Sequence, residues 1–177
     1  VIQRRPKVVY LHRDGALLEA IRDIHTILRT STAQPTQCKD LVAAWPDYIG
    51  IVDASSHGVG GVVLGELSGL PPTVFRLQWP PDVSAALVSI DNPKGSITNS
   101  DLEMAGLLLL WLCLEGVAPT MAHKHVALLS DNSPSVSWAT KMASKKSRVA
   151  AQLVRALALR LNINRACPVT TVHIPGI

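Results

Sequence analysis

The sequence predicts a mixed α/β fold in which a single sheet holds both antiparallel and parallel strands. Apolar runs rich in β-branched residues follow one another directly in the first half of the chain, at residues 48–52 and 59–66. In the second half, strand-like runs at 125–130 and 169–174 are separated by helical patterns. Strands joined by a short turn pair antiparallel, whereas strands joined through a helix pair parallel. A chain of 177 residues that is 47% hydrophobic can bury one such core.

An amphipathic helix is expected before the sheet. Over residues 15–30 apolar side chains recur at helical spacing, and the polar linker 31–40 follows. The apolar positions are Leu17, Leu18, Ile21, Ile24, Ile27 and Leu28.

The first strands are expected to form a hairpin and a third, adjacent strand. Residues 48–52 are a compact apolar run typical of a central strand, and the turn sequence SSHG joins them to the run 59–66. A third strand is expected over 73–79, because Pro80 and Pro81 cannot continue a hydrogen-bonded ladder. The residues that follow, as far as Gly95, are expected to form a long surface loop or insertion.

A buried helix is expected next. Ser100 and Glu103 have the spacing of a capping box in front of an apolar run, which predicts a helix over about residues 101–115. The longest uncharged apolar stretch, 104–114, lies inside it and is too short to span a bilayer. Residues 125–130 should be the strand that follows this helix.

Two more helices and a strand complete the expected order. Ser133 as N-cap, with Pro134 at the first helical position, predicts the start of a helix. A longer helix is expected over 148–162, and a last strand over 169–174. Strands separated by helices in this way should be parallel.

Cysteine usage and the chain ends point to the setting of the protein. Cys38, Cys113 and Cys167 are odd in number, far apart and without metal-ligand spacing, so a reducing, intracellular location is expected. The amino terminus carries early positive charge but lacks the apolar core of a signal peptide. A start without Met and an end within an expected strand favour a piece of a longer polypeptide.

Charge is segregated along the chain. The net charge is only +4, but no acidic residue follows Asp131. Clustered Lys and Arg favour a polyanionic partner, because each neutralised phosphate releases counterions. The alternative is a solvated helix end and loop over 141–148. The basic residues after Asp131 are Lys141, Lys145, Lys146, Arg148, Arg155, Arg160 and Arg165.

Three acidic residues lie in apolar surroundings, namely Asp53, Glu103 and Asp131. Asp53 and Asp131 are expected at the ends of strands and Glu103 in the first turn of a helix, so the three should meet at one edge of the sheet. Hard oxygen ligands suit Mg²⁺, and a pair of such ions supports phosphodiester hydrolysis without a nucleophilic side chain. The sequence therefore predicts a metal-dependent nuclease.

Each carboxylate also has a structural interpretation. Glu103 could cap the backbone of Ser100, a role that competes for the same oxygen atoms. Asp53 could make an Asx turn, although it precedes the turn. Asp131 could cap the following helix, although Ser133 is expected to fill that position.

The motifs IVDASSHGVGGVV, ITNSDLEMAGLLLLWL, ALLSDNSPSVSW and VTTVHIPG resemble the ribonuclease H domain of retrotransposon reverse transcriptase polyproteins. The resemblance covers about residues 47–177 and implies a five-stranded RNase H-like mixed sheet, with three antiparallel strands followed by parallel strands and flanking helices. It implies that residues 1–46 are a helical connecting segment, the tail of a reverse transcriptase region.

The resemblance implies cleavage of the RNA strand of RNA–DNA hybrids with two Mg²⁺ ions, or Mn²⁺ in their place. Asp53, Glu103 and Asp131 match the family's catalytic metal ligands. The family's fourth acidic ligand follows the HIPG-like strand and would lie beyond Ile177, so the ribonuclease H domain is expected to be incomplete at its carboxyl end. His173 is interpreted as a structural or surface histidine rather than a general base.

Substrate contacts can be assigned to polar and basic side chains. Small polar groups that read the 2′-hydroxyl in the minor groove, and basic groups that hold phosphates, are expected at Ser55, Ser56, Asn132, Ser133, Lys141, Lys145, Lys146 and Arg148. The expected partners are the hybrid and an upstream reverse transcriptase domain, in the cytoplasm or nucleus. The alternative functions are a catalytically degenerate nucleic-acid-binding or connection domain, or another nuclease or integrase built on the same sheet.

Overall fold

A computed structural model describes residues 15–32, 42, 45–65, 69–118, 120–145, 147–164 and 169–175. The chain divides into two compact units, Val1–Pro35 and Thr36–Ile177. In the first unit, helix α1 (Gly15–Thr32) confirms the expected amphipathic helix. Ile24 and Leu28 on its apolar side are 57% and 56% exposed.

The second unit contains one five-stranded sheet with the order β3-β2-β1-β4-β5. Strand β1 pairs antiparallel with β2, and β2 pairs antiparallel with β3. Strand β4 pairs parallel with both β1 and β5. The strands are β1 (Tyr48–Ala54), β2 (Gly58–Gly65), β3 (Leu70–Gln78), β4 (Val126–Ser130) and β5 (Val169–His173). The predicted mixed sheet, with three antiparallel strands followed by parallel strands, is confirmed.

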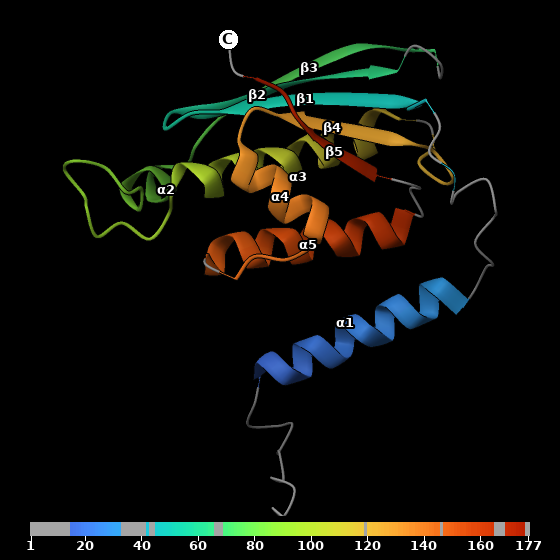
Figure 1. Cartoon of the computed structure of the whole chain (residues 1–177), viewed down its shortest axis with the longest axis horizontal. Coiled ribbons are helices and arrows are strands. Elements are labelled where there is room, and N and C mark those ends of the chain that lie inside the picture. Colours follow the sequence, from blue (N-terminus) through green and yellow to red (C-terminus); the bar gives the residue numbers. More distant parts are fainter. Residues whose placement is uncertain are drawn as a thin grey trace, which may run out of the picture. The chain divides into compact units, whose positions relative to one another are not determined.

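Helices α3 (Asn99–Val117), α4 (Ser133–Lys141) and α5 (Arg148–Asn164) lie on one face of this sheet (Figure 1). Helix α3 is apolar on nearly all sides because it packs against the sheet as well as α4 and α5. Its Leu107, Leu110 and Trp111 are completely buried. None of the described helices combines the length and hydropathy of a membrane-spanning segment.

A glycine in β1 allows α3 to approach the sheet closely. A Cβ atom at Gly50 would lie 2.7 Å from Leu110 Cδ2 and 2.9 Å from Leu110 Cγ. The missing side chain leaves this space to Leu110, which fills it. The depth at which α3 sits on the sheet therefore depends on this residue.

The expected long loop after β3 contains a short helix, α2 (Pro81–Ala85). Beyond α2, an isolated parallel β-bridge between Leu87 and Ile97 holds the two ends of the remaining loop together. Asn92 stabilises this loop, since its side-chain amide donates to Ala85 O and Leu87 O, each at 3.0 Å. Of the two predicted alternatives, a long surface loop or an insertion, the structure thus shows an insertion with a short helix and a bridge.

Both helix starts predicted from capping patterns were placed wrongly. Helix α3 is capped by Thr98, whose hydroxyl accepts from Asp101 N while the Asp101 carboxylate accepts from Thr98 N, and not by Ser100 with Glu103. Helix α4 is capped by Asn132, whose side chain accepts from Ser135 N at 2.9 Å, and not by Ser133. The first shift is important for function because it leaves Glu103 without a capping role.

Candidate metal centre

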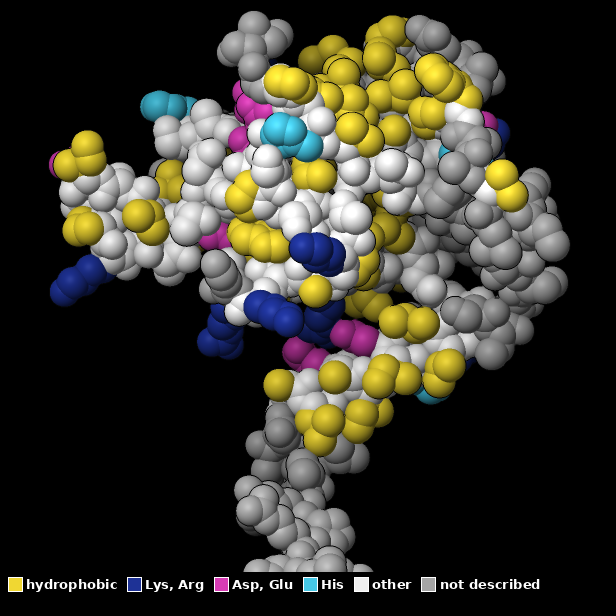
Figure 2. All heavy atoms as spheres, viewed as in Figure 1, with side chains coloured by type: hydrophobic (Ala, Val, Ile, Leu, Met, Phe, Trp, Pro, Cys, Tyr) yellow, Lys and Arg dark blue, Asp and Glu magenta, His cyan; other side chains and the backbone are white. Residues whose placement is uncertain are grey.

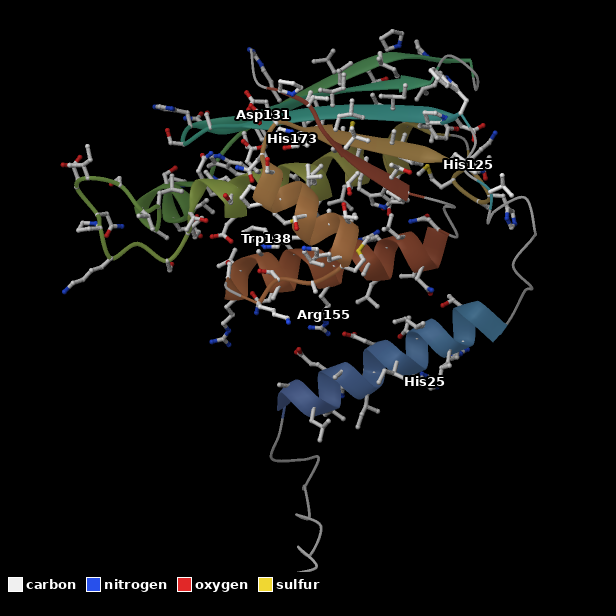
Figure 3. The ribbon with its side chains drawn as sticks, in the orientation of Figure 1. His25, His125, Asp131, Trp138, Arg155 and His173 are labelled. Atoms are coloured by element: carbon white, nitrogen blue, oxygen red, sulfur yellow. The ribbon has the colours of Figure 1, made fainter. Side chains whose placement is uncertain are left out.

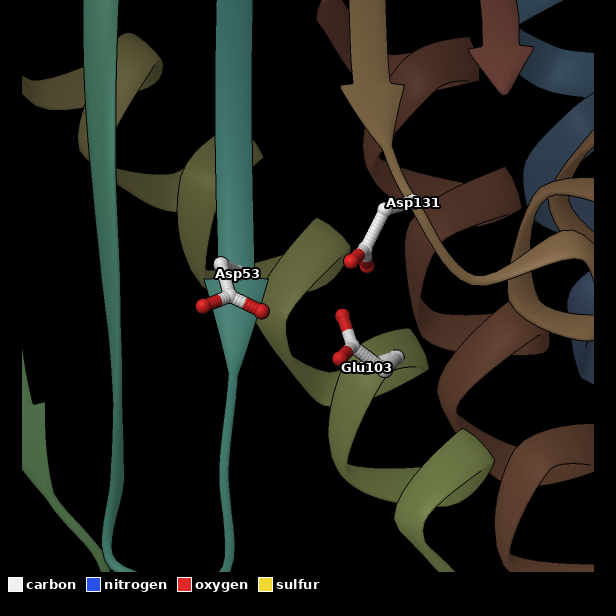
Figure 4. Close-up of side chains that lie close together, drawn as sticks. All are labelled: Asp53, Glu103 and Asp131. Carbon is white, nitrogen blue, oxygen red and sulfur yellow. The ribbon is translucent and has the colours of Figure 1, made fainter. Parts of the chain in front are cut away.

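The topology of the sheet brings the three predicted carboxylates together. Strands β1 and β4 are parallel neighbours, so their carboxyl ends meet at the same edge. Asp53 is the penultimate residue of β1, Asp131 follows β4 directly, and Glu103 lies near the start of α3. One oxygen atom from each carboxylate lies within 4.8 Å of the others, and Figure 4 shows the side chains pointing toward one another.

Glu103 is the buried member of this carboxylate cluster. Its side chain is only 2% exposed, whereas Asp53 and Asp131 are exposed. Glu103 Oε1 accepts from Ala54 N and Oε2 accepts from Ser130 Oγ, both at 3.4 Å. These bonds hold the glutamate against β1 and β4, with the two aspartates between it and solvent.

The ionised form of Glu103 is disfavoured in this setting. Its pKa is raised to about 7, chiefly by burial and also by the negative charges of Asp53 and Asp131, against the opposing effect of the Ala54 and Ser130 hydrogen bonds. Among the described residues, no Lys, Arg or His side chain forms an ion pair with any of the three carboxylates. Within the described part of the chain, the cluster therefore has no ion pair that compensates its negative charge.

A divalent cation fits this arrangement. Three converging carboxylates supply the hard oxygen ligands that Mg²⁺, Mn²⁺ and Ca²⁺ take. A cation placed among them would offset the repulsion that raises the pKa of Glu103. The residues present are thus suited to a metal, and Asp53, Glu103 and Asp131 are the groups that would hold it.

A shallow groove of about 560 Å³ adjoins Asp53 on the side of β2 and β3. Asp53, Gly60 and Arg76 lie in one row across these strands, and all three line the groove. The lack of a side chain at Gly60 keeps the space between Arg76 and Asp53 open; a Cβ atom there would lie 3.7 Å from Phe75 O, an ordinary contact distance. The remaining lining residues are Ser55, His57, Gly58, Val59, Leu77 and Gln78.

The small polar residues predicted to contact substrate lie around the cluster. Several of them already make hydrogen bonds within the protein. Ser55 and Ser56 are exposed in the turn after Asp53, where Ser55 Oγ accepts from His57 N at 3.2 Å. Asn132 uses its side-chain oxygen for the α4 cap, and its amide donates to Ser100 Oγ at 3.4 Å. Ser133 is exposed at the first position of α4.

The basic segment is defined here as residues 141–148, which join α4 to α5. Its described cations, Lys141, Lys145 and Arg148, are all exposed, and Lys146 lies outside the described residues. In Figure 2, Lys and Arg side chains gather over the region of α4 and α5. This surface is suited to phosphate groups.

His173 lies beside Asp131 in Figure 3. Its ring atom Nε2 is 2.9 Å from the backbone oxygen of Asp131, and the side chain is exposed at the end of β5. Ile174 N also donates to Ser130 O at 3.1 Å. His173 therefore joins the ends of β4 and β5 through the backbone of Asp131.

Sequence reasoning missed two residues next to the cluster. Ser130, completely buried, donates to Glu103, and Asp101, 2% exposed, closes the α3 cap. The Thr98 and Asp101 spacing is itself a capping pattern that could have been noticed. Nothing local marks Ser130, since its partner is 27 positions away.

No protein-family model matches the chain, and no curated protein was found similar to it. Its likeness is to solved structures. LC11-RNase H1, isolated from compost by a metagenomic approach, superposes with a TM-score of 0.50 at 17% identity, covering 74% of this chain and 86% of that one. The same enzyme in complex with RNA/DNA hybrid gives a TM-score of 0.51 at 16% identity over 72% and 85%.

RNase H1 from the archaeon Halobacterium salinarum is similar at 13% identity and a TM-score of 0.45, over 72% of this chain and 83% of that one. The fold assignment rests on the two LC11 structures. The strand order, the parallel and antiparallel pairing and these superpositions together define the ribonuclease H fold for this chain.

Proposed function

We propose that this protein hydrolyses the RNA strand of RNA–DNA hybrids with divalent cations held by Asp53, Glu103 and Asp131. The observation that carries the proposal is the convergence of three carboxylates within 4.8 Å at the edge of a ribonuclease H fold, with no ion pair to a Lys, Arg or His side chain among the residues that the structure describes. Mg²⁺ is the proposed ion, in a pair, with Mn²⁺ as a substitute. The hybrid bound to LC11-RNase H1 supports the choice of substrate.

The bound ions would activate a water molecule and stabilise the oxygen that leaves the phosphorus. The protein's own residues position this chemistry. Glu103 is held by hydrogen bonds from Ala54 and Ser130 and would offer an oxygen from the buried side of the cluster. The exposed Asp53 and Asp131 face the solvent, from which a phosphate would approach. Strand ends and a helix turn hold all three, so little reorganisation is needed on binding.

Substrate binding is assigned to the surroundings of the cluster. Ser55 and Ser56 lie in the turn after β1, and Asn132 and Ser133 lie at the start of α4, where small polar groups and backbone could meet 2′-hydroxyls. The basic segment would hold phosphates without reading sequence. It contributes Lys141, Lys145, Lys146 and Arg148.

The proposed setting is a retroelement reverse transcriptase polyprotein, supported by the motif resemblance over residues 47–177. In that setting residues 1–46 would be the connecting segment after an upstream reverse transcriptase domain. The protein would then act inside the cell, in the cytoplasm or nucleus, as part of a retroelement particle.

The test is cleavage of a labelled RNA–DNA hybrid in Mg²⁺ by the wild-type chain, by Asp53→Asn and by Asp91→Asn. Asp91 is an exposed acid in the insertion after β3 and is the matched control. We expect cleavage by the wild type and Asp91→Asn and its loss in Asp53→Asn, with hybrid binding kept in all three. A wild-type protein that binds the hybrid without cleaving it would instead be the degenerate binding domain.

Neutralising the basic segment should change binding in a defined way. Lys145→Ala is expected to weaken hybrid binding equally for all sequences and to reduce the slope of log affinity against log salt by about 1, as for one lost phosphate contact. Lys94→Ala removes an exposed lysine outside the segment and is the control. Fluorescence anisotropy at several salt concentrations measures both. A loss confined to certain sequences would contradict the assignment.

A further inference from the structure

Asp101 is a buried carboxylate that the proposed chemistry does not use. It is 2% exposed, and its Oδ2 accepts from Thr98 N at 2.8 Å and from Thr98 Oγ1 at 2.7 Å. Its Oδ1 accepts from Ser147 Oγ, a residue of the basic segment. Every described partner of this buried anion is a neutral donor, so its position depends on these hydrogen bonds being made together.

Ser147 is the N-cap of α5. Its hydroxyl accepts from Ala150 N at 3.0 Å while donating to Asp101. Ser144 Oγ donates to Ser147 O at 3.2 Å, which closes the turn that carries Lys145. The Ser147 hydroxyl thus joins the cap of α5 to the cap of α3, and the backbone oxygen of the same residue closes the turn of the basic segment.

The start of α3 is held from two sides. Successive residues of a helix are turned by about 100°, so Asp101 and Glu103, two positions apart, project in nearly opposite directions. Glu103 is bonded to β1 and β4, and Asp101 is bonded to α5. The first turns of α3 therefore lie between the carboxylate cluster and the basic segment and touch both.

A second contact of similar kind ties the same two helices at their other ends. Glu115 of α3 accepts from Arg160 at 3.0 Å and from Asn164 Nδ2 at 2.6 Å. Because the starts and the ends of α3 and α5 meet pairwise, the two helices run parallel. The Glu115 contact lies a helix length away from the cluster and offers an internal comparison.

We propose that the Asp101–Ser147 hydrogen bond is a positioning device that fixes the basic segment relative to the metal-binding carboxylates. The inference rests on the proposed function, since the ligand to be positioned is the RNA–DNA hybrid. Phosphates held by Lys145 and Arg148 are then at a fixed distance from the phosphate that faces the cluster. Without the bond the segment still carries its charges. Its lysine and arginine side chains are then no longer held at the distance from the cluster that matches the spacing of phosphates in the hybrid.

The test compares variants that each remove one hydrogen bond between α3 and α5. Ser147→Ala removes the contact near the cluster, and Asn164→Ala removes an equivalent donor to a carboxylate at the far end. Ser147→Thr and Asp101→Asn are conservative variants, because a threonine hydroxyl still donates and an asparagine amide can donate to Ser147 while its oxygen serves Thr98. The readouts are KM, kcat, hybrid affinity in EDTA with its salt slope, and the urea midpoint of unfolding.

For Ser147→Ala we expect a rise of about tenfold in KM and in the dissociation constant, a salt slope smaller by about 1, and kcat within about twofold of wild type. Asn164→Ala should lower the urea midpoint less than Ser147→Ala does, because it leaves the N-cap of α5 in place, and it should leave KM and the salt slope unchanged. Both conservative variants should restore wild-type KM. Equal KM and salt slope in Ser147→Ala and Asn164→Ala would overturn the proposal.

The two proposals fail in different ways. If the wild type cleaves the hybrid but Ser147→Ala behaves as Asn164→Ala does, the positioning role is wrong and the ribonuclease function stands. If the wild type binds without cleaving, and Ser147→Ala alone changes the affinity and salt slope, the positioning role stands without the catalytic one. A wild-type protein that does not bind the hybrid would overturn both.

Discussion

At the scale of single residues, Glu103 shows how the fold and the proposed chemistry oppose each other. Packing of α3 on the sheet buries this carboxyl group, and burial with two neighbouring aspartates raises its pKa to about 7. An unfolded chain would ionise the same group near its ordinary value of 4.5. The folded protein without metal therefore holds a proton that the unfolded chain has already released at intermediate pH.

This difference predicts the pH dependence of stability in the absence of metal. Between about pH 4.5 and about pH 7 the folded state binds the additional proton, so the free energy of unfolding falls as the pH rises through this window, by on the order of 3 kcal/mol in total. Glu103→Gln should remove the slope because glutamine does not ionise. Urea unfolding in EDTA across this range measures it, and an unchanged slope in the variant would contradict the assignment to Glu103.

At the scale of elements, the placement of α3 decides the site. The sequence contains two overlapping capping patterns, Thr98 with Asp101 and Ser100 with Glu103, and local spacing does not choose between them. The choice is made by Ala54 and Ser130, which hold Glu103 inside the fold through contacts distant in the sequence. The cap then falls to Thr98 and Asp101.

A pair of hydroxyl deletions tests this cap. Thr98→Ala is expected to lower the free energy of unfolding by about 1 kcal/mol, as for loss of an N-cap side chain. Ser100→Ala should have a clearly smaller effect, because Ser100 lies within α3 and its hydroxyl has only a 3.4 Å contact from Asn132. Denaturant unfolding of both variants gives the comparison. A larger loss of stability in Ser100→Ala than in Thr98→Ala would identify Ser100 as the N-cap of α3.

The close approach of α3 to β1 gives a second prediction at this scale. Gly50→Ala would place a methyl group 2.7 Å from Leu110 and should cost about 1–3 kcal/mol through overpacking. Gly60→Ala is the matched control, because its Cβ atom would meet Phe75 O at 3.7 Å. Thermal unfolding measures both variants. An equal effect of the two substitutions would mean that α3 does not depend on this contact.

Element types were predicted from the sequence more reliably than their ends. Apolar periodicity identified all five strands and the main helices because burial imposes it directly on the chain. The helix α2 was missed, since a five-residue helix beside two prolines leaves no periodic signal. The cap of α4 was displaced by one residue because Asn132, Ser133 and Pro134 all suit a helix start, and only the Asn132 side chain reaches Ser135 N.

At the scale of the whole molecule, the carboxylate cluster is formed by residues far apart in the sequence, and no single segment of the chain contains it. Its three members come from β1, α3 and the end of β4, and they meet only when the central strands pair in parallel. The residue types were readable from the sequence, but the 4.8 Å separation was not, because it follows from strand order. Metal binding is thus expected only in the folded state.

Because the cation is expected to bind only the folded state, its binding can be measured as an increase in stability. A cation that binds only the folded protein stabilises it by RT ln(1 + [L]/Kd), which is about 2.7 kcal/mol at a concentration one hundred times Kd. Mg²⁺ or Mn²⁺ should therefore raise Tm with concentration in the wild type and far less in Asp53→Asn. Asp91→Asn should respond as the wild type does. Equal responses from Asp53→Asn and the wild type would place the cation elsewhere.

Three helices begin on the side of the fold where the carboxylates lie, α3 and α4 at the edge of the sheet and α5 behind the start of α3. Helix α3 starts beside Glu103, α4 starts just after Asp131, and α5 is joined to the start of α3 through Ser147. The aligned peptide dipoles of a helix give its amino-terminal end a partial positive charge of roughly half an elementary charge. This charge belongs to the backbone and does not titrate. A polyanion approaching the edge therefore meets a backbone field that is the same at every pH and that only salt can screen.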